Sequence, residues 1–127
     1  MYNIEKSALR IKSSEFAVRI TNMVNYLKDN KNKKIGPILT QVLRSGTSIM
    51  ANISESQFAQ TRADFITKLH IALKEANETK TWLILLYRSG CLTIVQYESI
   101  VNDNNEIIAM LVSSLNTSKR NDNRHNT

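Results

Sequence analysis

Apolar residues in this chain of 127 residues recur every three or four positions over four long segments. That spacing places them on one side of an α-helix, because a helix completes a turn in about 3.6 residues. The sequence holds only three glycines and one proline, too few for the many turns of a β-sandwich or barrel. The pattern therefore predicts an all-α protein and argues against an all-β fold.

The four segments are separated by residues that start or stop helices. The predicted helices cover residues 13–28, 37–58, 61–90 and 93–116, with Gly90 at the end of the third. Each predicted start carries a residue that suits the first turn of a helix: Ser13 or Ser14, Pro37, Thr61 with Asp64, and Thr93 with Gln96.

Short connections place sequential helices antiparallel to one another. The sequence therefore predicts one domain, residues 13–116, folded as an antiparallel up-down-up-down four-helix bundle. Residues 1–12 form a leader to which the pattern assigns no structure. Residues 117–127 are dominated by Asn, Ser, Thr and charged side chains, so a disordered polar tail is predicted there.

Gly46 lies in the middle of the second predicted helix, where two apolar rows meet. A glycine inside a helix costs about 1 kcal/mol relative to alanine, so this position needs the absence of a side chain. The expected reason is a neighbouring helix that passes close by, backbone to backbone. Ser45, Ser48 and Ala51 are further small residues beside it.

A polar row runs along the same helix at the same spacing: Ser45, Ser48, Asn52 and Glu55. If the row is exposed, it is the solvated face of the helix. If it is buried, it forms a hydrogen-bonded network that fixes the register between helices or between subunits. The spacing alone is compatible with both interpretations.

The third and fourth predicted helices carry more apolar residues than one bundle can cover. The main row of the fourth helix is Ile94, Tyr97, Val101, Ile108, Leu111 and Leu115, with Asn104 its single polar member. Outside the main rows of the two helices lie Ile71, Ile84, Leu85, Ile100 and Ile107. This excess indicates burial against another copy of the chain, and scattered exposed apolar residues are the alternative.

Motifs for catalysis, metals and cofactors are missing from the sequence. No Glu-x-x-His pair of the kind that binds metals in helical bundles occurs. The glycines at 36, 46 and 90 are too far apart for a loop that cradles phosphates. Cys91 directly follows a predicted helix end, which favours a packed thiol over a nucleophile. A non-enzymatic protein without a metal or cofactor is expected.

Glu75 and Glu78 lie near His70 on the third predicted helix. Nearby lysines on the same helix offer them ion pairs: Lys68, Lys74 and Lys80. Paired surface charges are therefore expected here rather than an acid-base or metal site.

No uninterrupted apolar run is longer than six residues, the length of the run at residues 82–87. A bilayer requires about 20, so no membrane partner is expected. The single cysteine cannot form an internal disulfide, and the first thirty residues show no signal-peptide pattern. These features predict a cytoplasmic protein.

The chain carries 17 Lys and Arg against 11 Asp and Glu, a formal net charge of +6. Such an excess favours acidic partners, nucleic acid before membrane. The candidate phosphate-binding residues are Lys28, Lys31, Lys33, Lys34, Arg44, Arg62, Lys68 and Lys74. The lysine run can also be a solvated loop. No recognition-helix pattern or aromatic stacking platform accompanies these cations, so any recognition would be directed at shape and backbone.

Two stretches together resemble a known family. Residues 43–55 read LRSGTSIMANISE, and residues 63–90 read ADFITKLHIALKEANETKTWLILLYRSG. They resemble the four-helix-bundle family named after open reading frames in intervening sequences of bacterial 23S ribosomal RNA genes, over about residues 16–111. The family pattern usually has Gly at the position of Met50 and Ala at that of Ser54.

The resemblance implies an antiparallel four-helix bundle that assembles as a homo-oligomer, with rings of five known in the family. It also implies a relationship to the accessory protein of diversity-generating retroelements, a basic pentamer that binds nucleic acid and works with a reverse transcriptase. The resemblance favours the interpretation of the polar row as a buried network between helices or subunits. The family's motif residues, which have no agreed roles, are Arg44, Ser45, Gly46, Ser48, Asn52, Glu55, Asp64, Phe65, Lys68, Leu69, Glu75, Glu78 and Trp82.

Two functions follow from these observations. The first is a homo-oligomeric bundle, with a pentamer favoured, whose basic surface binds RNA or DNA with little sequence selectivity. The second is an adaptor that presents its excess apolar surface to a different helical protein and binds no nucleic acid.

Overall fold

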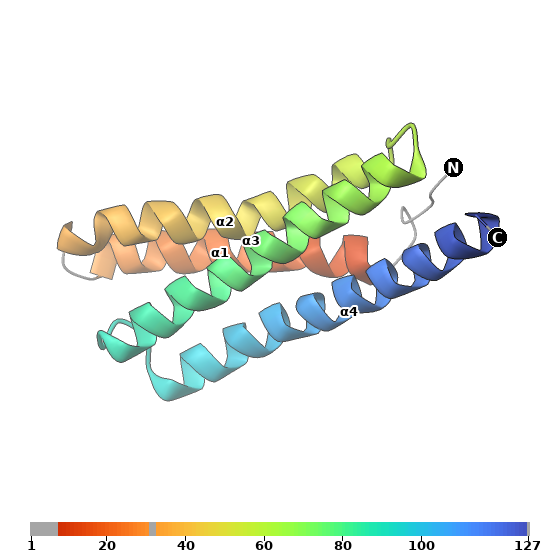
Figure 1. Cartoon of the computed structure of the whole chain (residues 1–127). Coiled ribbons are helices and arrows are strands. Elements are labelled where there is room, and N and C mark those ends of the chain that lie inside the picture. Colours follow the sequence, from red (N-terminus) through yellow and green to blue (C-terminus); the bar gives the residue numbers. More distant parts are fainter. Residues whose placement is uncertain (1–7, 31–32, 127) are drawn as a thin grey trace.

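The protein is an antiparallel up-down-up-down bundle of four α-helices, as the sequence predicted (Figure 1). The structure, a computed structural model, describes residues 8–30 and 33–126, without the side chains of 33 and 121–126. The elements are α1 (Ala8–Asn30), a short 3-10 helix η1 (Lys33–Ile35), α2 (Gly36–Ser56), α3 (Arg62–Arg88) and α4 (Ile94–Asn126). Within these described residues there is no strand.

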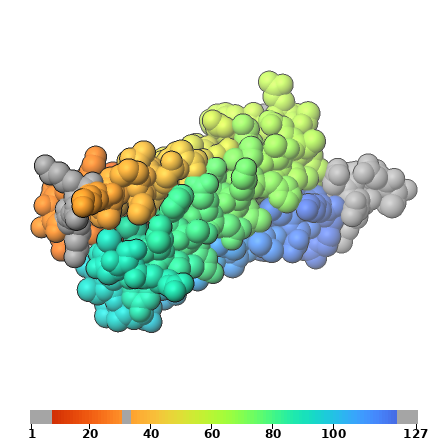
Figure 2. Space-filling model, turned by 60° about the vertical axis from the view of Figure 1, so that its left-hand side comes forward, coloured from red at the N-terminus to blue at the C-terminus, as the bar shows by residue number. Residues whose placement is uncertain are grey.

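Each helix packs against the next in the chain, and α4 closes the bundle against α1. Figure 2 shows α3 lying across one face of the molecule, in contact with α2 on one side and with α4 on the other. The contact between α1 and α4 is the smallest of those between neighbouring helices. The first and last helices therefore form the loosest seam of the bundle.

α1 begins earlier than predicted, at Ala8 rather than at Ser13 or Ser14. Leu9 is buried on the same side of the helix as Phe16, which adds one more turn to the core. Ser13 is buried within this extended helix, and its hydroxyl donates to the carbonyl of Arg10 (3.0 Å) instead of capping the helix. The rest of the predicted leader, residues 1–7, lies outside the described residues.

The connection between α2 and α3 follows the prediction. The Thr61 hydroxyl accepts a hydrogen bond from the backbone N–H of Asp64 (3.0 Å), which caps α3. Asp64 itself lies in the first turn of α3, where the helix dipole favours a negative charge.

The connection between α3 and α4 also follows the prediction. Gly90 adopts a φ of +81°, a conformation that favours glycine. Its N–H donates to the carbonyl of Tyr87 (3.0 Å), and the next N–H, of Cys91, donates to that of Leu86 (2.9 Å), which ends α3 in a Schellman motif. Thr93 and Gln96 then exchange side-chain and backbone hydrogen bonds and start α4.

α4 continues as a helix through Asn126, where the composition predicted a disordered tail from residue 117. No glycine or proline interrupts residues 94–126, so nothing in the local sequence stops the helix. Leu115 is the last buried residue among those whose side chains are described. The remaining turns extend the helix beyond the core.

The buried face of α4 differs from the predicted row. Ile107 is fully buried and Ile100 is 3% exposed, so neither belongs to an exposed excess, whereas Ile94 is 47% exposed. The physical reason is that α4 packs against both α1 and α3, which buries a wider face than a single seam. Of the predicted excess, Leu85 is exposed and Ile71 and Ile84 are half-buried.

Gly46 is buried where α2 faces α1, which confirms that a neighbouring helix passes close by. The close neighbour is a side chain, however, and not the predicted backbone. A Cβ atom at position 46 would lie 2.9 Å from Cγ2 of Ile20, closer than normal van der Waals contact. The glycine therefore makes room for the β-branched side chain of Ile20.

Candidate functional site

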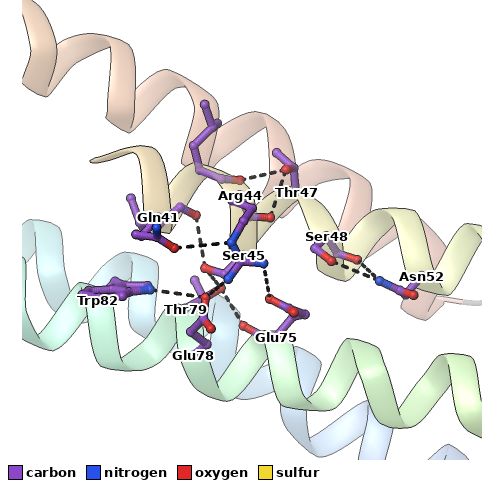
Figure 3. Close-up of polar contacts among 12 residues, drawn as sticks. Gln41, Arg44, Ser45, Thr47, Ser48, Asn52, Glu75, Glu78, Thr79 and Trp82 are labelled. Atoms are coloured by element: carbon purple, nitrogen blue, oxygen red, sulfur yellow. Dashed lines mark hydrogen bonds and ion pairs between the residues drawn. The ribbon is translucent and has the colours of Figure 1, made fainter. Parts of the chain in front are cut away.

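The motif residues of the second and third helices meet in a polar seam between α2 and α3 (Figure 3). At its centre, the hydroxyl groups of Ser45 on α2 and Thr79 on α3 form a hydrogen bond of 2.8 Å, and both residues are fully buried. Thr79 Oγ1 also lies 2.8 Å from the carbonyl oxygen of Glu75. The seam thus contains a buried polar contact that fixes how α2 sits on α3.

Arg44 closes the exposed side of the same seam. Its guanidinium group forms ion pairs with Glu75 (3.2 Å) and Glu78 on α3 (Figure 3). Glu78 also accepts a hydrogen bond from the indole N–H of Trp82 (3.4 Å). The two glutamates therefore pair with an arginine of another helix, and not with the lysines of α3 as predicted.

The rest of the polar row on α2 is not a buried network. Asn52 donates to the carbonyl (2.9 Å) and hydroxyl (3.1 Å) of Ser48 one turn earlier, and both residues are half-buried. Glu55 is exposed and pairs with Lys68 of α3 (3.0 Å). The hydrogen bond to Glu55, and then the charge of that carboxylate, raise the pKa of Lys68 above its ordinary value of 10.5. The polar row is therefore a buried hydrogen-bonded contact at Ser45 and a solvated helix face at Glu55.

The candidate phosphate-binding residues do not form one patch. Lys28 and Lys34 are exposed at the end of the bundle where α1 leads into α2. Lys31 lies outside the described residues, as does the side chain of Lys33. Arg62 begins α3 at the opposite end of the bundle. The cations are thus distributed over both ends of the molecule.

Some of the candidate cations are neutralised by ion pairs, and others are not. Arg44 and Lys68 are held in ion pairs between helices. Lys74, on the exposed side of α3, forms no ion pair with another described residue. Sequence reasoning missed Lys119 and Arg120, which are exposed on α4, because it assigned them to a disordered tail. The absence of glycine and proline after Leu115 was the available signal.

Exposed apolar side chains lie on α1 and in the α2–α3 connection as well as on the two predicted helices, α3 and α4. On α1, Ile11 is 52% exposed and Val18 59% exposed, one heptad apart on the same face. The other large exposed apolar side chains of the described residues are Tyr26, Phe58, Leu85, Ile94, Val95 and Val112. Apart from Leu85, none belongs to the excess that the sequence indicated.

Groups that could support catalysis are dispersed. In the described part of the chain, no three or more His, Cys, Asp or Glu side chains are grouped so that they could hold a metal ion. Cys91 is a free, half-buried thiol, and His70 is exposed.

Over residues 8–30 and 33–126, no helix combines the length and apolar character needed to span a bilayer.

Comparisons with known proteins agree with the fold and the motifs. The family model described as 23S rRNA-intervening sequence protein matches residues 5–113. The crystal structure of a protein of unknown function from the S23 ribosomal protein family of Bacteroides thetaiotaomicron VPI-5482 is 54% identical, with a TM-score of 0.82. The alignment covers 85% of this chain and 98% of that one. No curated protein matches. The chain therefore belongs to the 23S rRNA-intervening sequence protein family.

Proposed function

We propose that the protein is a non-enzymatic, homo-oligomeric bundle that binds RNA or DNA through backbone phosphates with little sequence selectivity. The observation that carries this proposal is the distribution of charge. The ion pairs between helices join four cations, Lys12, Arg19, Arg44 and Lys68, to a larger number of carboxylates. These pairs therefore do not account for the net positive charge of +6. The excess resides on exposed side chains such as Lys28, Lys74 and Lys119.

The description of the matching family model, an intervening-sequence protein of 23S rRNA, is compatible with this proposal, and the similar crystal structure has no stated function. A family resemblance to the accessory protein of diversity-generating retroelements supports nucleic acid as the partner and favours a ring of five. It also suggests a reverse transcriptase as a candidate partner protein. The free thiol of Cys91 suits the reducing cytoplasm.

Self-association is proposed to use the exposed apolar face of α1. Ile11 and Val18 on that face lie more than half exposed, and burying them against another copy would remove apolar area from water. Light scattering coupled to size-exclusion chromatography measures the assembly directly. A mass of several chains is expected, and a monomer at micromolar concentration would contradict the proposal.

Nucleic-acid binding is tested by filter retention of a structured RNA and a duplex DNA. Retention is expected at about 50 mM salt, with the logarithm of the association constant falling linearly with the logarithm of salt by roughly 0.9 for each phosphate that the protein neutralises. Retention that is absent at low salt, or that does not respond to salt, would contradict the proposal.

An adaptor that binds a helical protein is the second candidate. Phe58, in the turn that follows α2, is 75% exposed, which is typical of an aromatic anchor for a partner. Capture of partners from a lysate with and without nuclease separates the two functions. Partners that remain bound after nuclease treatment support the adaptor.

A further inference from the structure

A pocket of about 300 Å³ opens at the seam between α1 and α4. Its apolar part is formed by Met23 of α1, Leu92 of the α3–α4 connection and Ile100 of α4. Leu92 and Ile100 are almost completely buried, at 6% and 3% exposure, so they form the floor of the pocket. The floor is rigid because both residues belong to the hydrophobic core.

Polar and aromatic groups complete the lining. Asn22 contributes a carboxamide from α1 and Gln96 another from α4. The Gln96 carbonyl oxygen accepts the N–H of Thr93 (2.9 Å), which leaves its NH₂ group as a donor. Asn22 forms no hydrogen bond with another described residue. Tyr26 adds an aromatic ring that is 53% exposed.

Arg19 limits the pocket along the seam. Its guanidinium group donates to Asp103 (2.6 Å) and to Ser99 (2.6 Å for the hydroxyl and 3.2 Å for the carbonyl), and so crosses from α1 to α4. From Arg19 to Tyr26 the pocket spans two helical turns, about 10 Å. The Arg19 bridge therefore closes one end of the pocket, which is open to solvent on its outer side.

We infer that this pocket binds an unpaired nucleobase, which deepens the proposed function and rests on it. An aromatic ring that is open to solvent provides a stacking surface, and two carboxamides provide the donors and acceptors that read base edges. The charge of Arg19 is balanced by Asp103, so the ligand part that enters is neutral. A single base with its ribose suits the small volume.

The pocket chemistry disfavours the other occupants. A partner helix needs apolar anchors over two turns, and the exposed polar side chains of Asn22 and Gln96 interrupt the apolar lining within that length. A cation would require carboxylates, and none lines the pocket among the described residues. An exposed base in a single strand or a loop can enter from the solvent side, whereas a paired base cannot.

The test uses the full chain labelled with ¹⁵N, titrated with uridine and adenosine 5′-monophosphates. Shifts are expected at the amides of residues 22–26 and 96–100. Fluorescence anisotropy then compares a short single-stranded RNA with a blunt RNA duplex of the same length. Tyr26→Ala should weaken binding of the single strand about tenfold, since stacking of a base on an aromatic ring contributes on this scale.

Two variants serve as controls. Tyr26→Phe keeps the ring and should bind like the wild type. Val95→Ala removes an exposed side chain of α4 that does not line the pocket, and it should also leave single-strand binding unchanged. Both Tyr26 variants change a half-exposed side chain, so their thermal unfolding is expected to match that of the wild type.

The outcomes distinguish the two proposals. Duplex binding that persists while the nucleotides leave the pocket amides unshifted, or while Tyr26→Ala changes single-strand affinity less than twofold, overturns the proposed base pocket and leaves phosphate binding intact. Nucleotides that shift the pocket amides while the duplex does not bind overturn the proposed phosphate-directed function and support the pocket.

Discussion

The substitution Gly46→Ala, which adds one methyl group to α2, measures how closely α1 packs on that helix. Gly46→Ala gains about 1 kcal/mol of helix propensity, but the new Cβ would lie 2.9 Å from the branched side chain of Ile20, which is fully buried. Because overpacking of a core costs about 1–3 kcal/mol, we expect a net loss of stability of about 1 kcal/mol in urea unfolding.

Gly36 provides the matched control for this variant. It begins α2, and a Cβ there meets nothing within 4 Å. Gly36→Ala should therefore leave stability unchanged or raise it by a few tenths of a kcal/mol. A Gly46→Ala protein as stable as Gly36→Ala would contradict the proposed contact with Ile20.

The buried hydroxyl pair makes a second prediction. Thr79→Val keeps the side-chain shape but leaves Ser45 with only a long hydrogen bond of 3.4 Å to the carbonyl of Val42. A buried hydroxyl that loses its partner costs about 1–3 kcal/mol. Ser45→Ala should cost less, because Thr79 retains its bond to the carbonyl of Glu75 (2.8 Å).

A double-mutant cycle in urea unfolding measures this coupling. Replacing both partners by apolar groups removes the unsatisfied hydroxyl, so the double variant should be more stable than Thr79→Val alone. Strictly additive losses would show that the two hydroxyl groups do not depend on each other.

At the scale of the elements, ion pairs at the two long seams make stability depend on alkaline pH. Lys12 of α1 pairs with Glu106 of α4, and Lys68 of α3 pairs with Glu55 of α2. In each case the hydrogen bond to the glutamate is the main cause of a pKa above the ordinary value of 10.5. This contribution to stability is complete below pH 10.5 and is lost as pH rises through the raised pKa.

The variant Lys68→Gln isolates one of these pairs. It should be slightly less stable than the wild type near pH 8, and the difference should shrink as pH rises through the raised pKa of Lys68, because the wild type then loses this charge as well. Urea unfolding of the two proteins across this range provides the measurement. A difference that grows with pH would contradict the assignment.

The last turns of α4 contribute to charge rather than to the core. Deleting residues 117–127 removes no described side chain that is buried, so the free energy of unfolding should change by less than about 0.5 kcal/mol. Leu115→Ala, one turn earlier, should cost about 2–5 kcal/mol because Leu115 is 3% exposed.

The same deletion tests the role of this segment in nucleic-acid binding. It removes Lys119 and Arg120, so the salt dependence of RNA binding should become shallower, by roughly 0.9 in slope for each phosphate that the shortened protein no longer neutralises. An unchanged slope would show that the end of α4 does not touch the nucleic acid.

At the scale of the whole molecule, the features that depend on neighbours in the sequence were predictable. The caps at Thr61 and Thr93 and the left-handed Gly90 follow from residues within one turn, and the structure confirms all three. The order and direction of the four helices follow from these boundaries and from short connections.

Features that depend on three-dimensional neighbours were not predictable. Arg44 pairs with glutamates 31 and 34 residues away, so no spacing along one helix reveals the partners. Ile107 is buried because α4 faces two helices at once, which a single apolar row does not show. The pocket combines residues of α1 with residues far later in the chain, and therefore exists only in the folded protein.

The small contact between α1 and α4 has a consequence for local opening of the bundle. Such a boundary separates cooperative units, so amide hydrogens along it should exchange with solvent through local openings that cost less than global unfolding. The hairpin of α2 and α3, with its long shared surface, should exchange slowest. A ligand at the boundary between α1 and α4 would thus enter and leave without melting the bundle, and its binding would be seen as slower exchange on both helices.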